Sequence, residues 1–191
     1  MRTFLLVLLT FLAGSEAWLH WGNCPDLTPK FNQYLNTYFN GTWYLRSGYN
    51  SDPIPGFGRC GNTKFTYNST SKTAKVKFTH LSSWLNRWES VNGTVTPSQP
   101  YTDGKMILEI PKRWGFWDET MPYWVLTGYY YIDYTVVYSC KNVLFNFHYH
   151  SARVLSRSPD TDLSNVDDIL KSFNLDPRKF VTYDQSNCTN H

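Results

Sequence analysis

The chain has 191 residues, with 18 Lys and Arg against 15 Asp and Glu, which gives a formal net charge of +3. This length predicts one domain, and the lack of a clustered run of basic residues argues against a nucleic-acid-binding protein. Aromatic residues are 18% of the chain, a proportion expected either of a strand-rich core or of a cavity lined with rings.

The first 17 residues have the organisation of a secretory signal peptide. Arg2 supplies a positive charge, residues 4–11 are apolar, and residues 15–17 carry small side chains at the two positions that cleavage requires. The apolar run is short for a membrane span, and no later segment is apolar enough to be one. We therefore expect residues 1–17 to be a signal peptide and residues 18–191 to form one secreted, extracellular domain without a transmembrane segment.

The cysteine content fits an oxidising compartment. Cys24, Cys60, Cys140 and Cys188 are an even number, as in a disulfide-bonded secreted protein, and four cysteines allow three pairings. Their wide spacing, without a Cys-x-x-Cys motif, argues against a zinc site or a redox motif.

Four Asn-x-Ser/Thr sequons predict a glycoprotein. We favour Asn68 and Asn92 as the glycosylated positions. Asn40 adjoins the turn at Gly41, and Asn187 directly precedes a cysteine, so these two are less favoured.

An irregular arm with Pro25 and Pro29, ending in a short helical turn at 30–34, leads into a series of strands. The strands alternate apolar and polar residues most clearly at 73–80, and the fourth should bend or bulge near Gly93. Turn residues separate them, which indicates an up-and-down meander. The predicted strands are 42–49, 59–67, 73–80, 84–96, 105–110, 122–129, 133–141 and 143–157.

Eight antiparallel strands can close into a barrel with room for one small ligand. After Pro159 the apolar residues change to a helical spacing, which predicts one amphipathic helix over 160–173, capped by Asp160, Thr161 or Asp162. The predicted fold is all-β: an eight-stranded up-and-down antiparallel β-barrel with one C-terminal α-helix packed on it.

Alternation along the strands also selects candidate ligand-binding residues, each of which would serve equally well as plain core. An aromatic loop at 111–121 carries Trp114, Phe116 and Trp117, which would either fringe the open mouth or form a surface patch for a membrane or protein partner. The candidates facing the cavity are Phe78, Trp84, Trp88, Met106, Leu108, Ile110, Tyr123 and Val125.

The sequence offers little catalytic or metal-binding chemistry. His148 and His150 share a face of the eighth strand, but no third ligand stands at a supporting spacing. We therefore predict exposed or interface histidines and no metal site. No nucleophile elbow, His-Glu-x-x-His motif or Gly-rich phosphate loop is present, so we predict no enzyme and no catalytic residues.

Several segments resemble the lipocalin family, in particular its apolipoprotein D-like and bilin-binding-protein-like members. Gly41-Thr42-Trp43 is similar to the first lipocalin signature, and residues 121–126 with 136–140 resemble the region of the second. Residues 153–159 resemble the third signature, with Arg157 as its arginine, and residues 181–188 resemble the chain end of these proteins. The second signature departs from the family pattern, because residues 127–129 lack its aspartate and one extra residue precedes Cys140.

The resemblance implies disulfides Cys24–Cys140 and Cys60–Cys188. It also implies that Gly41, Trp43 and Arg157 are structural, with the Arg157 guanidinium lying on the Trp43 indole at the closed end, a contact that cation–π attraction would stabilise.

The function implied by the resemblance is extracellular binding, transport or storage of a small hydrophobic ligand: a bilin, carotenoid, retinoid, sterol or fatty acid. The abundance of aromatic residues adds the hypothesis of a bound chromophore, biliverdin or a carotenoid, with no cofactor required. An alternative is a secreted interaction or sequestration protein that uses the loop 111–121 for a homo-oligomer or a protein partner. Some lipocalins are isomerases with a free thiol, an alternative disfavoured here because all four cysteines look paired.

Overall fold

The computed structural model describes residues 19–31, 35–49, 58–83, 85–98, 104–111, 119–128, 133–143 and 146–188. The predicted signal peptide, the candidate Trp84 and the aromatic trio Trp114, Phe116 and Trp117 lie outside the described residues.

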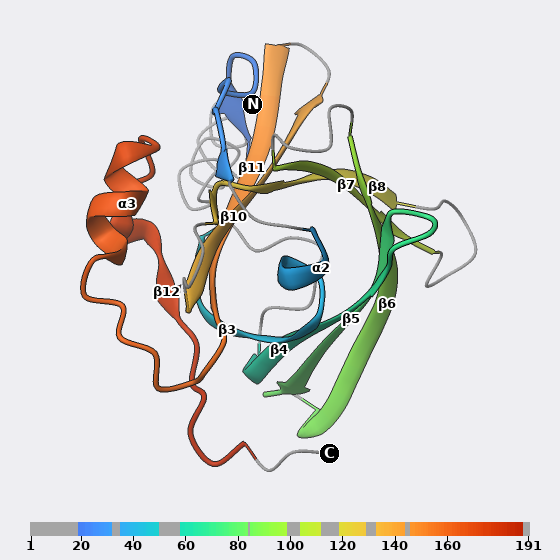
Figure 1. The fold of residues 1–191 in the computed structure, drawn as a ribbon. Helices are drawn as coiled ribbons and strands as arrows, with labels where there is room; N and C mark the ends of the chain where they lie inside the picture. Colours follow the sequence, from blue (N-terminus) through green and yellow to red (C-terminus); the bar gives the residue numbers. More distant parts are fainter. Residues whose placement is uncertain are drawn as a thin grey trace, which may run out of the picture.

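Eight antiparallel strands form a closed barrel, which confirms the predicted fold class. Each strand pairs with the next along the chain, and the last, β11, pairs with the first, β3, so that the sheet closes on itself (Figure 1). The strands are β3 (Gly41–Tyr49), β4 (Gly58–Asn68), β5 (Thr73–Ser82), β6 (Arg87–Pro97), β7 (Lys105–Ile110), β8 (Glu119–Val125), β10 (Tyr134–Val143) and β11 (Phe147–Ser156).

Short elements decorate this barrel. Strand β1 (His20–Trp21) pairs with β11, β12 (Val181–Thr182) pairs with β3, and β2 (Lys30–Phe31) runs parallel to β9 (Thr127–Gly128). The helices are α2 (Leu35–Tyr38), which lies within the barrel outline in Figure 1, α3 (Val166–Ser172) on its outer side, and the 3₁₀ turn η2 (Pro177–Lys179). Within the described residues no helix is long and apolar enough to cross a membrane.

Two helix predictions were wrong in their bounds. Lys30 and Phe31, predicted to be helical, form strand β2, and the helix α2 begins at Leu35. The C-terminal helix starts at Val166 rather than at 160, because the Asp162 carboxylate accepts a hydrogen bond from the Ser164 backbone N–H. An Asp side chain that holds a local turn competes with helix formation at that point.

A bulge, one of the two irregularities predicted near Gly93, is not present in the pairing of β5 with β6. The register of β5 and β6 is regular there, with Val76 opposite Gly93. Gly93 is required for a different reason: a Cβ at this position would lie 2.8 Å from the Glu109 backbone oxygen of the next strand. The register shifts occur instead in β4, between Arg59 and Asn62, and where β11 meets β3.

Side chains of alternating strand positions build two cores. Inside the barrel, Met106, Leu108 and Ile110 of β7 are buried, whereas Ile107 and Glu109 between them are exposed. Such alternation places every second residue of a strand on the inner face.

The second core lies between the outer face of β10 and β11 and the helix α3. Leu170 of α3 and the following Phe173 are buried in one cluster with Val136, Tyr138 and Val154. This packing confirms a C-terminal helix on the barrel wall and explains why those strands are apolar on both faces.

Trp43 and Arg157 meet at the closed end of the barrel. The Arg157 guanidinium carbon lies 3.8 Å from the centroid of the Trp43 ring, and Trp43 Nε1 donates a hydrogen bond to the Tyr38 carbonyl at 3.0 Å. Arg157 Nη2 donates to the Thr37 carbonyl at 2.7 Å and Nη1 to the Asn40 carbonyl at 2.8 Å. The arginine thus binds the last carbonyls of α2, which have no partner inside the helix.

The C-terminal tail fills a split between β3 and β4. These strands pair only from Gly41 to Tyr44; beyond that point β12 of the tail pairs with β3. Gln185 Nε2 donates to the Leu45 carbonyl at 2.6 Å and to the Gly61 carbonyl at 2.9 Å, one on each side of the split. The tail therefore supplies hydrogen bonds that the diverging strands no longer give each other.

Both disulfides implied by the resemblance are present. Cys24–Cys140 ties the N-terminal arm to β10, and Cys60–Cys188 fastens the tail beside the split. They span 116 and 128 residues, and loops of that length give up to about 4–5 kcal/mol each in the chain-entropy model.

We expect Arg157→Met to lower the free energy of unfolding by about 1–3 kcal/mol, because it removes the hydrogen bonds to the carbonyls of Thr37 and Asn40 together with the cation–π contact. Urea unfolding followed by tryptophan fluorescence would measure this. Arg87→Met is the matched control: the Arg87 side chain is 67% exposed, so its loss should cost less than about 0.5 kcal/mol. Equal losses in the two variants would contradict a structural role for Arg157.

We expect Gln185→Leu to destabilise the protein by about 1–3 kcal/mol and to increase amide hydrogen exchange at Cys60 and Tyr183, whose N–H groups bond across the same split. Gln185→Glu, which has the same shape but no donor, should behave similarly. Ser186→Ala, at the exposed neighbouring position, should change neither quantity. Unaltered exchange in Gln185→Leu would show that the tail does not hold the split closed.

Candidate functional site

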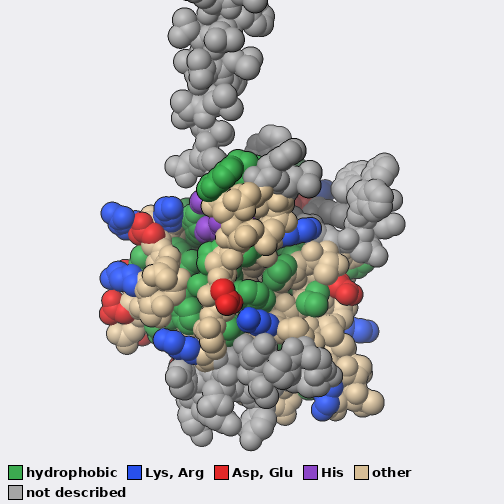
Figure 2. All heavy atoms as spheres, turned by 90° about the horizontal axis from the view of Figure 1, so that it is seen from above, with side chains coloured by type: hydrophobic (Ala, Val, Ile, Leu, Met, Phe, Trp, Pro, Cys, Tyr) green, Lys and Arg blue, Asp and Glu red, His purple; other side chains and the backbone are tan. Residues whose placement is uncertain are grey.

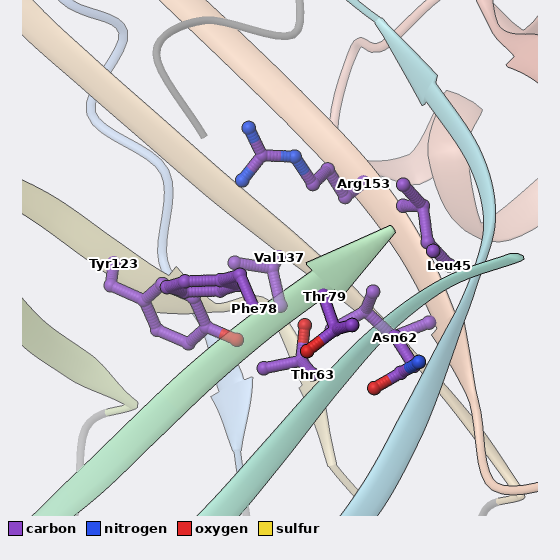
Figure 3. A pocket seen from close by; sticks show the side chains of 10 residues that line it. Leu45, Asn62, Thr63, Phe78, Thr79, Tyr123, Val137 and Arg153 are labelled. Atoms are coloured by element: carbon purple, nitrogen blue, oxygen red, sulfur yellow. The ribbon is translucent and has the colours of Figure 1, made fainter. Parts of the chain in front are cut away.

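A small cavity lies inside the barrel, lined by residues from β3, β4, β5, β8, β10 and β11. Its free volume is about 20 Å³, roughly the space of one water molecule. The lining residues, shown in Figure 3, are Leu45, Gly61, Asn62, Thr63, Phe78, Thr79, Tyr123, Val137, Arg153 and Leu155.

Six of the eight candidate ligand-binding residues lie inside the barrel, and two of these line the cavity itself. Phe78 and Tyr123 contribute directly to its wall. The other four are buried in the same inner core: Met106, Leu108, Ile110 and Val125.

Trp88 lies on the opposite face of the wall. Its register partner is Leu81, whereas the neighbouring pair His80 and Glu89 faces inward with an ion-pair distance of 3.6 Å. Trp88 therefore shares the outer face with the exposed Ser90 and Asn92. The prediction placed Trp88 in the correct strand but on the inner face, whereas the structure places it on the outer face.

Several lining residues were not predicted, and Arg153 is the most consequential. The same alternation that places Leu155 of β11 inside the barrel also places Arg153 there, two residues earlier. Only 8% of its surface is exposed. Arg153 was not predicted because only apolar residues were considered as cavity-lining candidates. Its position on the inner face nevertheless follows from the alternation along the strand.

Beneath the cavity, aromatic side chains form the floor of the barrel. The fully buried Tyr38 packs at 4.7 Å from Phe39 and at 5.0 Å from Trp43, measured between ring centroids. Burial raises the pKa of Tyr123 to about 12, and burial followed by the influence of Tyr123 raises the pKa of Tyr38 well above its usual value. Both phenols are therefore neutral at physiological pH and present polar hydroxyls in an apolar enclosure.

The structure adds a third histidine, His20, to the predicted pair His148 and His150. Their ring centroids lie 4.5–5.5 Å apart, and the ring planes are nearly parallel. His148 Nδ1 and the Gly22 carbonyl are 2.9 Å apart, and His20 Nε2 bonds to the Tyr49 hydroxyl at 3.3 Å.

Stacked rings do not direct three nitrogens at one point, as a metal requires. In the part of the chain that the structure describes, no three His, Cys, Asp or Glu side chains are arranged to hold a metal ion. Histidine side chains reach the surface on the face shown in Figure 2. Their contacts place them at the interface between the N-terminal strand β1 and the barrel.

The asparagines of all four sequons are exposed. Asn68 Oδ1 accepts hydrogen bonds from the backbone of Thr70 and Ser71, and Asn40 Oδ1 accepts one from Tyr67. Glycosylation at Asn68 and Asn92 stays a prediction.

The histidine cluster predicts acid sensitivity. Burial, followed by the charges of His20, His148 and Lys179, lowers the pKa of His150 to about 4, and burial also lowers the pKa of His20. Between pH 6.5 and pH 4 the unfolded chain then binds more protons than the folded chain, so the free energy of unfolding falls as the pH falls. Allowing for partial solvent exposure, we expect His150 to account for about 1–2 kcal/mol.

Urea unfolding at pH 7.5, 6, 5 and 4 would measure this loss. The variant His150→Phe keeps the ring contacts with Tyr49 and Tyr138 but has no proton to take up. It should lose less stability than the wild type over the same range. A variant with the same pH profile as the wild type would exclude His150 as a source of acid sensitivity.

Comparison with known proteins gives full-length matches. The chain is 32% identical over 195 residues to apolipoprotein D of Cavia porcellus, covering 96% of both chains. It is 27% identical over 192 residues to the Lazarillo protein of Schistocerca americana, covering 96% of this chain and 83% of that protein. No protein-family model matches.

Solved structures agree with this result. Insecticyanin from the tobacco hornworm Manduca sexta superposes with a TM-score of 0.72 at 26% identity, covering 88% of this chain and 89% of that one. Lobster apocrustacyanin A1 superposes with a TM-score of 0.70 at 19% identity, covering 90% and 93%. The second of these likenesses concerns the fold alone.

Proposed function

The chain belongs to the lipocalin family, and from this premise we propose that it binds a small hydrophobic molecule inside its barrel and carries or stores it outside the cell. The observation that supports this most directly is the barrel interior itself. It is enclosed, largely apolar and sealed at one end by Trp43 and Arg157. Burial of an apolar ligand in such a site is worth about 25 cal/mol per Å².

A ligand that occupies this cavity would have to displace some of its lining side chains. A free volume of about 20 Å³ is far below the roughly 300–1,000 Å³ of ordinary ligand pockets. Among the cavity-lining residues, the rings of Phe78 and Tyr123 are the largest side chains, so a bound molecule would displace one or both. A conjugated planar ligand, such as biliverdin or a carotenoid, could then stack on the aromatic side chains of the interior.

Secretion is part of this proposal. The predicted signal peptide, the two disulfides and the four exposed sequons all suit an extracellular protein. All four cysteines are in disulfides, so an isomerase chemistry that depends on a free thiol has no group to use in this chain.

A second candidate is a sequestration protein that binds a macromolecule. Trp21 is 73% exposed and packs edge-on against Phe147 at 5.1 Å, and Leu19 beside it is half exposed. These residues adjoin the start of β11, whereas Arg157 follows the end of that strand. They therefore lie at the open end of the barrel, where β7 ends at Ile110. Loss of partner capture with intact small-ligand binding, in a variant lacking residues 114–117, would favour this candidate.

Native mass spectrometry of the protein from its source, with extraction of whatever it holds, tests the leading proposal. In a parallel test, purified protein is incubated with biliverdin or astaxanthin, and we expect visible absorbance to co-elute with the protein. Val137→Phe places a ring in the cavity and should weaken binding about tenfold or more, whereas Ile107→Phe, on the exposed outer face, should not. Near-ultraviolet circular dichroism checks that both variants fold. An empty protein from the source, and no binding of any ligand class, would refute the proposal.

A further inference from the structure

The C-terminal tail forms part of the barrel wall. Among the described residues, β3 pairs with β4 only up to Tyr44, and beyond that point the same edge of β3 pairs with β12. The tail is bonded to β4 as well, because the Cys60 N–H donates to the Asp184 carbonyl at 2.8 Å. A short piece of tail therefore stands between two neighbouring strands that would otherwise bond to each other directly.

The cavity adjoins this part of the wall. Its lining includes Leu45 of β3 together with Gly61 and Asn62 of β4, where the two strands separate (Figure 3). Gln185 Nε2 of the tail donates to the Leu45 carbonyl at 2.6 Å and to the Gly61 carbonyl at 2.9 Å. The tail is therefore fastened, on both sides of the split, to residues that line the cavity themselves.

The ring of Tyr183 lies on the inner side of the wall. Gly48 of β3 stands opposite Arg153, which lines the cavity, and directly opposed residues of antiparallel strands point to the same face. A Cβ on Gly48 would lie 3.2 Å from the Tyr183 ring, which therefore covers the inward side of this glycine. The half-buried ring also packs against the core inside the barrel. Tyr183 is thus a residue of the tail that lies at the edge of the barrel interior.

This section of the wall is held by fewer bonds than a continuous pair of strands. β5 and β6, for comparison, are paired without interruption from Ala74 to Ser82. The tail pairs with β3 only at Val181 and Thr182, and is otherwise held by the bonds described above and by the Cys60–Cys188 disulfide. Moving the tail outward breaks these few hydrogen bonds, whereas parting two long strands breaks a whole ladder.

We propose that residues 181–188 are the movable wall of the ligand site. A molecule that enters the barrel pushes the Tyr183 ring outward and takes the space between Leu45 and Gly61, while the disulfide at its end keeps the tail attached. This inference rests on the proposed function and adds, to the movement of the lining side chains, a place where the backbone gives way. A cavity with a free volume of about 20 Å³ gains room most easily where its wall is held most weakly.

Hydrogen exchange of the wild-type protein tests the inference without any mutation. The probe is N-phenyl-1-naphthylamine, an apolar molecule whose fluorescence rises on entering an apolar site. With the probe bound, the amides of Cys60 and Tyr183, which bond across the split, should exchange about tenfold faster or more, as measured by NMR. Amides of the β5–β6 ladder are the control and should not exchange faster. Slower or unchanged exchange at Cys60 and Tyr183 would overturn the inference.

Removal of the ring tests the same point by affinity. Tyr183→Ala spares the probe the cost of displacing the ring and should bind it about threefold more tightly or better. Tyr183→Phe keeps the ring and should bind as the wild type does. Tyr67→Ala is the matched control, since Tyr67 also packs its ring against the inner core but belongs to β4, and it should not bind more tightly. Binding by Tyr183→Ala that is no tighter than binding by Tyr67→Ala would contradict a movable wall.

The two levels of the proposal fail differently. If the probe does not bind and the protein from its source yields no extractable ligand, the proposed function fails and the inference with it. If the probe binds while the amides across the split keep their protection, the inference is wrong and the proposed function stands. If Tyr183→Ala does not fold, as judged by near-ultraviolet circular dichroism, the hydrogen exchange of the wild type decides the question.

Discussion

The contact between Trp43 and Arg157 joins the two ends of the barrel sheet. Trp43 stands at the start of β3 and Arg157 directly follows β11, so the 3.8 Å stack links the first and last strands where the sheet closes. The same guanidinium binds carbonyls of α2 and of the segment that leads into β3. One half-buried side chain thus contacts the closure of the barrel, the end of a helix and the entry to the first strand.

This closure makes the two ends of the barrel different. The sealed end is filled by Tyr38, Phe39, Trp43 and Phe65, with ring centroids 4.7–6.2 Å apart. These rings would have to separate before a ligand could pass between them. The split between β3 and β4 is a second weak place, and it is covered by the tail through Gln185 and the Cys60–Cys188 disulfide. We therefore expect a ligand to enter at the end opposite Trp43.

The sequence predicted this architecture well wherever strands are long and their alternation is regular. The inner positions of β7 were correct because the period of two is unbroken there. Trp88 was misplaced because it lies near the start of β6, where the parity depends on a strand end that the pattern does not mark. Asn62 was missed because a register shift in β4 alters the alternation locally, and the C-terminal helix began late because Asp162 bonds within a turn. The disulfide pairing came from family resemblance, since four cysteines alone allow three pairings.

Arg153 and Arg157 show how one strand can use the same residue type in two ways. They stand four residues apart at positions of equal parity, with Leu155 between them. Arg157 meets an indole face and several carbonyls supplied by the chain, an arrangement that stabilises the fold. Arg153 is buried, and it lines the cavity inside the barrel together with Leu155. The position of each arginine along the strand, rather than its residue type, therefore decides which of the two belongs to the closed end of the barrel.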